Sequence, residues 1–247
     1  MVLISCFGLA GQELPCHNPQ KFISIFEKAK EANLKLIPHC GEEFEKTDEG
    51  IATAIENVEW CVNQGCTRIG HAVVLGYKAE YLSEATEQKQ KELIAKIKTQ
   101  NIIIESMPYS NICIQSTGVT TSLNHLQPLL DASCEIVLGS DDAACWSKSI
   151  VECMNEQRNM FAFNYGLDEL KRICFYSIRS FAEIASEDKD KLYARIIEAR
   201  KAHEVPCIDM HAHFAASLCN IDKIFEENTR EKQEKGTAQK FLRNPKK

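Results

Sequence analysis

The chain has 247 residues, of which 44% are hydrophobic and 26% are charged, the balance of a folded globular protein rather than a disordered one. Its 29 Lys and Arg residues against 35 Asp and Glu residues give a net charge of -6, which argues against binding to nucleic acid or to an anionic membrane surface. No apolar stretch is long enough to span a bilayer. Because the charge argues against nucleic acid and membrane surfaces, we expect the ligand to be a small molecule.

Twelve cysteines are scattered along the chain, mostly in apolar segments, and none forms a C-x-x-C pair. Isolated cysteines in a chain of this length are typical of small buried side chains in a reducing compartment. Residues 1–7 are apolar but lack the basic start and the cleavage site of a signal peptide. We therefore expect a cytoplasmic protein.

Short apolar runs alternate with longer amphipathic stretches up to residue 142. The predicted strands are residues 2–7, 34–39, 68–71, 101–105 and 135–138. The predicted helices between them are residues 22–33, 51–58, 84–98 and 123–130. Strand and helix alternate at intervals of roughly thirty residues, which is typical of βα units that build a parallel sheet.

The pattern becomes helical over residues 148–203, and a last strand is predicted at residues 205–213. A charged helix and a basic tail follow. No internal repeat or change of composition divides the chain, so we expect one domain over residues 1–220 and the charged helix and tail over residues 221–247.

Polar residues that can carry chemistry lie at or just past the ends of the predicted strands. They are His39, Glu42, His71, Asp141 and Asp142. Because the carboxyl ends of parallel strands meet at one edge of a sheet or barrel, this placement predicts a site there. His71 taken alone is equally typical of a buried core histidine.

Each of the other motifs also has a structural interpretation. His39 with Glu42 can serve as a metal ligand and a proton donor, or Glu42 can belong to an acidic surface loop. Asp141 and Asp142 are adjacent carboxylates that need a cation or a ligand, unless Asp142 caps a helix. The segment Met107–Asn111 is expected to be a structured loop without a catalytic role.

The predicted last strand carries the sequence His211-Ala212-His213. Residues two apart on a strand point to the same side, so both imidazoles can bind one metal ion. Two surface histidines on an edge strand would look the same.

Taken together, these motifs resemble the adenosine deaminase family of the metal-dependent amidohydrolase superfamily. The matching segments are Leu9–Glu13, His39–Glu42, Arg68–His71, Glu105–Asn111, Ser140–Asp142 and Met210–Phe214. The first five occur in the family's order and spacing over residues 1–185.

The resemblance implies a (β/α)8 TIM-barrel fold that holds one zinc ion. The implied zinc ligands are His39, Asp141, His211 and His213. Glu42 would protonate the purine ring nitrogen, and His71 with Asp141 would orient and deprotonate the metal-bound water. The residues expected to contact the substrate are Gly11, Asp142 and His213. The implied reaction is hydrolytic deamination of adenosine or a related 6-aminopurine nucleoside or nucleotide, giving inosine or its analogue and ammonia.

The order of the motifs departs from the family, because the H-x-H strand comes first there and last here. Six predicted strands stand where the barrel has eight. We therefore expect an incomplete, circularly permuted barrel of about six strands, which self-associates through open apolar edges. The alternative is an inactive, truncated or rearranged remnant that binds a purine or a protein partner.

Overall fold

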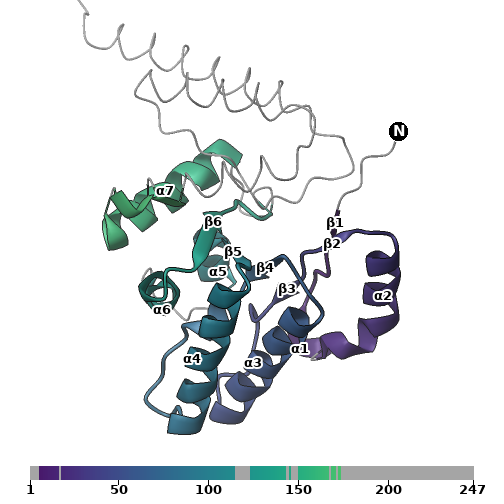
Figure 1. The fold of residues 1–247 in the computed structure, drawn as a ribbon. Helices are drawn as coiled ribbons and strands as arrows, with labels where there is room; N and C mark the ends of the chain where they lie inside the picture. Colours follow the sequence, from purple (N-terminus) through teal and green to yellow (C-terminus); the bar gives the residue numbers. More distant parts are fainter. Residues whose placement is uncertain are drawn as a thin grey trace, which may run out of the picture. The chain divides into compact units, whose positions relative to one another are not determined.

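Figure 1 shows the computed structural model, which describes residues 6–173 apart from residues 17, 115–122, 143–144, 146–149, 167 and 171. All of these residues belong to the first of the two compact units into which the chain divides. Helices and strands alternate along the described residues, and every strand pairing is parallel. The mixed α/β fold with parallel strands predicted from the sequence is confirmed.

The strands of the described residues are β1 (Cys6–Phe7), β2 (Lys35–Leu36), β3 (His39–Cys40), β4 (Arg68–His71), β5 (Ile103–Ser106) and β6 (Glu135–Leu138). The helices are α1 (Glu13–Cys16), α2 (Ile23–Glu31), α3 (Asp48–Asn63), α4 (Glu84–Thr99), α5 (Pro108–Cys113), α6 (Gln127–Asp131) and α7 (Ile150–Tyr165). Short 3₁₀ helices are η1 (Pro19–Phe22), η2 (Val73–Leu75) and η3 (Asn124–Leu126).

Strand β1 pairs with β2, and strands β3, β4, β5 and β6 follow one another in chain order. Pro38 has no N–H group, and it separates β2 from β3 within the strand predicted over residues 34–39. Hydrogen bonds from Ile37 N to Phe7 O (2.8 Å) and from His39 N to Leu9 O (2.7 Å) bridge this gap. The chain from β2 to β3 therefore lies between β1 and β4 in one run of parallel segments.

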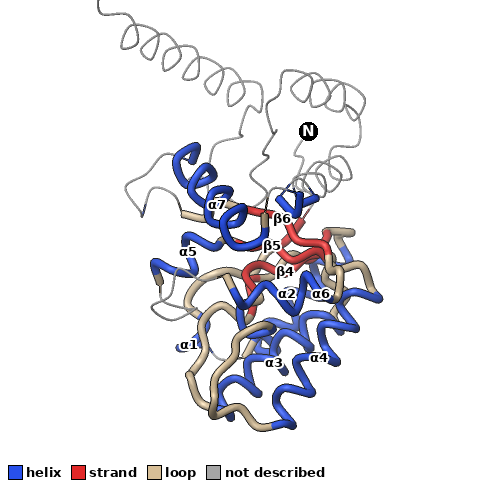
Figure 2. Tube along the Cα trace, turned by 90° about the vertical axis from the view of Figure 1, so that its left-hand side faces the viewer, coloured by secondary structure: helices blue, strands red, loops and turns tan. Residues whose placement is uncertain are grey.

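The long helices α3 and α4 lie side by side in Figures 1 and 2, and they pack against each other. Both begin at a capping side chain. Thr47 accepts a hydrogen bond from Gly50 N at the start of α3, and Ser83 accepts one from Thr86 N at the start of α4. The apolar faces of these helices supply much of the buried core, including Ile51.

Strands β4 and β5 carry a buried ion pair within the sheet. Arg68 Nη1 lies 2.8 Å from Glu105 Oε1, and both side chains are almost fully buried. Because an isolated charge in this environment would cost several kcal/mol, the two residues stabilise the sheet only as a pair.

Two predicted segments differ from the structure. Residues 107–111 were expected to be a loop, but all except Met107 lie in helix α5, which begins at Pro108, a residue favoured in the first turn of a helix. Residues 123–130 form η3 and α6 rather than one helix. The predicted strand at residues 205–213 and the charged helix at residues 221–247 lie outside the described residues.

Among the described helices, none combines the length and the apolar character that a membrane span requires.

Candidate active site

The polar residues predicted at the strand ends come together at one edge of the sheet. His39 lies on β3, Glu42 on the turn that follows it, His71 at the end of β4, and Asp141 just after β6. These side chains are buried except that of His39, which is partly exposed. Asp142, next to Asp141, is exposed to solvent.

His71 is the centre of this cluster. Its Nδ1 atom lies 3.0 Å from Glu42 Oε1 and 2.8 Å from Asn111 Oδ1. Its Nε2 atom lies 3.9 Å from Asp141 Oδ2. The rings of His39 and His71 meet edge to face, with their centroids 4.9 Å apart.

The surroundings of His71 favour its protonated form. Burial by itself lowers the pKa of this imidazole, but the hydrogen bond and charge of Glu42 oppose that effect. The charge of Asp141 and the hydrogen bond with Asn111 act in the same direction as Glu42, so that the pKa lies above its ordinary value. The imidazole is therefore suited to accept and hold a proton.

His39, Glu42 and His71 also form a possible metal site. One ligand atom from each of these residues lies within 4.8 Å of the ligand atoms of the other two. Imidazole nitrogens together with a carboxylate oxygen are ligands that suit zinc and related transition metals. The geometry is compatible with a divalent cation without identifying it.

The backbone at this edge adopts left-handed conformations at residues that carry a Cβ atom. His71, Ala72 and Asp141 have φ angles of 64°, 49° and 56°. Such conformations cost on the order of 1 kcal/mol or more each, and they are concentrated at functional sites. Here they turn the chain immediately after β4 and near the end of β6, where the candidate residues lie.

Helix α5 contributes two adjacent side chains that the sequence analysis did not assign to the site. Ser110 Oγ donates a hydrogen bond to Asp141 Oδ2 (2.6 Å), and Asn111 contacts His71 as described. Both residues are buried. The available signal was their position just past β5, the same strand-end rule that selected the other residues.

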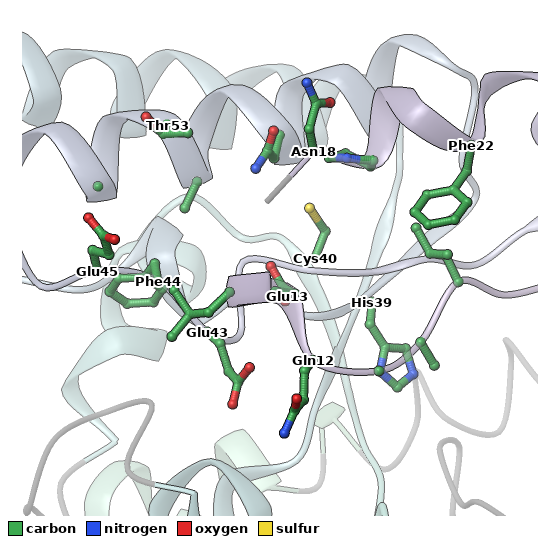
Figure 3. A pocket seen from close by; sticks show the side chains of 18 of the residues that line it. Gln12, Glu13, Asn18, Phe22, His39, Cys40, Glu43, Phe44, Glu45 and Thr53 are labelled. Atoms are coloured by element: carbon green, nitrogen blue, oxygen red, sulfur yellow. The ribbon is translucent and has the colours of Figure 1, made fainter. Parts of the chain in front are cut away.

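A cavity of about 300 Å³ adjoins this cluster (Figure 3). Gly11 and His39 are among its lining residues, whereas Glu42, His71 and Asp141 are not. The cavity therefore meets the cluster at His39. Its carboxylate side chains are Glu13, Glu43, Glu45 and Glu49, and its lining residues within the described part of the chain include no Lys or Arg.

The H-x-H motif of residues 211–213 lies outside the described residues, so the structure does not place it. Of the predicted site residues, the structure brings together His39, Glu42, His71 and Asp141. Gly11 lines the cavity beside them.

A sequence model described as adenosine deaminase matches residues 3–199. This chain belongs to the adenosine deaminase family. The motifs between Leu9 and Asp142 fall within the matched residues and the H-x-H motif falls beyond them. The family predicted from these motifs is thereby confirmed, and it is a family of hydrolytic deaminases.

The curated relatives are longer than the part that this chain matches. An adenine deaminase of Emericella nidulans is 27% identical over 186 residues, which cover 74% of this chain and 43% of that protein. An adenine deaminase of Chelativorans sp. is 28% identical over 196 residues, covering 78% of this chain and 52% of that protein. The chain thus spans about half the length of the curated relatives it matches.

Solved structures show a similar fold. The apo N6-methyl-AMP deaminase of Arabidopsis thaliana superimposes with a TM-score of 0.57 at 20% identity, over 81% of this chain and 51% of that chain. An ADAL–IMP complex gives a TM-score of 0.56 at 20% identity, over 81% of this chain and 50% of that chain. At this identity the likeness concerns the fold alone.

Proposed function

We propose that this protein is a zinc-dependent hydrolytic deaminase of adenosine or a related 6-aminopurine, which it converts into inosine or its analogue and ammonia. The observation that carries the proposal is the convergence of His39, Glu42, His71 and Asp141 at one edge of the sheet. Each of these residues occupies a position that the family motif assigns to catalysis or to the metal.

Four residues would hold the zinc ion. His39 and Asp141 are two of them, and the family motif supplies His211 and His213, which lie outside the described residues. Nitrogen and oxygen ligands of this kind fit a zinc site. Of the four, His39 also belongs to the group of close ligand atoms formed with Glu42 and His71. A zinc ion bound there would lower the pKa of a water ligand towards neutrality.

The remaining chemistry belongs to three side chains around the His71 ring: Glu42 Oε1 lies 3.0 Å from His71 Nδ1, and Asp141 Oδ2 lies 3.9 Å from His71 Nε2. Glu42 would donate a proton to the purine ring nitrogen beside the attacked carbon. His71 and Asp141 would orient the attacking water and accept its proton. The substrate contacts in this proposal are Gly11, Asp142 and His213.

The acidic lining of the cavity favours a substrate without a phosphate group. Four carboxylates and no basic side chain line its described part, and like charges disfavour binding of an anionic ligand. Adenine and adenosine are therefore the preferred substrates in this proposal, ahead of AMP and its N6-modified forms.

The proposal includes the finer architecture expected from the sequence, a (β/α)8-type barrel that is circularly permuted. Its support is the chain-order succession of parallel strands and the fold likeness to the Arabidopsis deaminase. The strand at residues 205–213 would carry the H-x-H ligands. A cytoplasmic location is supported by the eight cysteines whose side chains the structure describes, all of which are free thiols.

The test is turnover by the purified chain supplied with zinc. Adenosine, adenine, AMP and N6-methyl-AMP are each followed by the ultraviolet change that accompanies deamination. We expect turnover of adenosine or adenine, and a loss of about 100-fold or more in kcat for Glu42→Gln, because the ring nitrogen then has no proton donor.

Circular dichroism and zinc content establish that both proteins are folded and loaded. A folded, zinc-loaded protein that deaminates none of the four substrates contradicts the proposal. That result would favour the alternative expected from the sequence, an inactive remnant that binds a purine or a protein partner.

A further inference from the structure

The turn that carries Glu42 is built around a glycine. Gly41 has a φ angle of 75°, which residues with a Cβ atom rarely adopt. A Cβ atom at this position would lie 2.7 Å from Val74 Cγ1 and 2.9 Å from Val58 Cγ2. The chain therefore passes tightly between η2 and α3 immediately before Glu42.

The carbonyl side of this turn is held by the segment after β4. Val74 N donates to Gly41 O (2.9 Å), and Ala72 N donates to Cys40 O (3.2 Å). These bonds fix the position of the turn relative to β4. They leave the N–H groups of Gly41 and Glu42 to be satisfied from elsewhere.

Glu13 satisfies both N–H groups with one carboxylate. Its Oε2 atom accepts a hydrogen bond from Gly41 N (2.8 Å), and its Oε1 atom accepts one from Glu42 N (2.7 Å). Glu13 opens helix α1 and is separated from the turn by almost thirty residues of sequence. Figure 3 shows its side chain beside Cys40, which precedes the turn.

The protein maintains this carboxylate in an unfavourable place. Burial raises the pKa of Glu13 to about 7, although the two backbone hydrogen bonds lower it, and the nearby charge of Glu42 raises it further. No step proposed above uses the carboxyl group of Glu13. A side chain that merely filled space here would not carry this cost.

We propose that Glu13 is a positioning residue, which grips the Gly41–Glu42 backbone so that the Glu42 carboxylate is held against the His71 imidazole. The catalytic consequence rests on the function proposed above. Glu13 itself touches neither the reacting atoms nor the metal in this proposal. It acts through Glu42, whose Oε1 atom lies 3.0 Å from His71 Nδ1.

The hydrogen bonds are tested without any activity measurement. Backbone amide exchange at Gly41 and Glu42 is followed by NMR in the full chain and in Glu13→Gln and Glu13→Asp. We expect exchange at both amides to accelerate by about tenfold or more in each variant, because glutamine accepts fewer bonds and aspartate is too short to reach. Glu27→Gln, the same change on the exposed face of α2, is the matched control and leaves both amides unchanged.

The positioning role is tested at His71. The ring N–H proton shared with Glu42 gives a downfield NMR signal, which Glu42→Gln shifts. We expect Glu13→Gln to shift this signal in the same direction, and Glu27→Gln to leave it in place. Faster amide exchange with an unchanged His71 signal would overturn the proposal, because the hydrogen bonds from Glu13 would then not determine the position of the Glu42 side chain.

Measurements of kcat and KM distinguish a failure of this proposal from a failure of the proposed function. In an active protein, Glu13→Gln lowers kcat by about 10- to 100-fold with KM within about twofold of the parent, since misplacing a proton donor costs rate rather than binding. A rise in KM of about 10- to 100-fold with an unchanged kcat would contradict the positioning role. If the parent chain is inactive, the proposed function fails, and the His71 signal still decides the role of Glu13.

Discussion

Asp141 and Asp142 are adjacent carboxylates with different surroundings. Asp141 is buried, accepts a hydrogen bond from Ser110 and faces His71, whereas the side chain of Asp142 is exposed. At the scale of single residues, two neighbouring aspartates therefore differ in burial and in their contacts. The left-handed conformation of Asp141 accompanies this difference.

We expect Asp141→Ala to release zinc, because the change removes a proposed ligand from the sheet edge. The zinc affinity should fall on the order of 100-fold or more, measured by competition with a chromogenic chelator. Asp142→Asn is the matched control and should bind zinc like the parent. Unchanged zinc affinity in a folded Asp141→Ala protein would remove Asp141 from the ligand set.

At the scale of elements, the sequence predicted well wherever a strand or helix has a strong pattern of its own. Strands β4 and β6 were expected at residues 68–71 and 135–138 and have those bounds in the structure. All four residues of β4 and the last three of β6 are buried, on both faces of the strand, which is the environment of a parallel strand. Helix α3 was likewise predicted from its spaced apolar residues, and α4 as a charged helical stretch.

Short elements were less predictable because their conformation depends on neighbours in space. Helix α5 is only six residues long and offers no clear periodicity, so its segment was expected to be a loop. The same misjudgement hid Ser110 and Asn111, whose role comes from contact with Asp141 and His71. Glu13 lies in the Leu9–Glu13 motif but was given no role, since its partners are backbone N–H groups that the sequence does not reveal.

At the scale of the whole molecule, the sequence predicts a barrel with fewer strands than the family's eight. Strand edges that are not covered expose unpaired N–H and C=O groups and invite association. We expect the purified chain to self-associate at micromolar concentration, with a mass by light scattering above that of one chain. Added salt should not disperse the assembly, because its contacts are apolar. A monomer under these conditions would contradict the prediction.

One histidine outside the candidate site is buried in surroundings that disfavour its protonated form. His125 lies in η3, is almost fully buried, and has no hydrogen-bond partner for either ring nitrogen in the described structure. Its backbone is held close to Gly76, where a Cβ atom would lie 1.6 Å from the His125 carbonyl oxygen. Burial lowers the pKa of His125 to about 4.

This shift makes the folded state sensitive to acid. The unfolded chain takes up a proton at His125 near pH 6.5, whereas the folded protein does so only near pH 4. The contribution of neutral His125 is therefore fully present above pH 6.5 and is lost as the pH falls towards 4. The loss between pH 7 and pH 4.5 is about 2.5 kcal/mol in the free energy of unfolding.

Urea unfolding at pH 7 and pH 4.5 measures this loss. Glu13, with its pKa raised from 4.5 to about 7, changes stability in the opposite direction across this whole interval, so the parent alone does not isolate His125. The quantity compared is the free energy of unfolding at pH 7 minus that at pH 4.5. We expect His125→Leu and His125→Gln both to lower this quantity by about 2.5 kcal/mol relative to the parent. Leucine suits the apolar site and glutamine does not, so agreement between the two separates titration from packing. A pH dependence equal to that of the parent in both variants would show that His125 does not set the acid sensitivity of the fold.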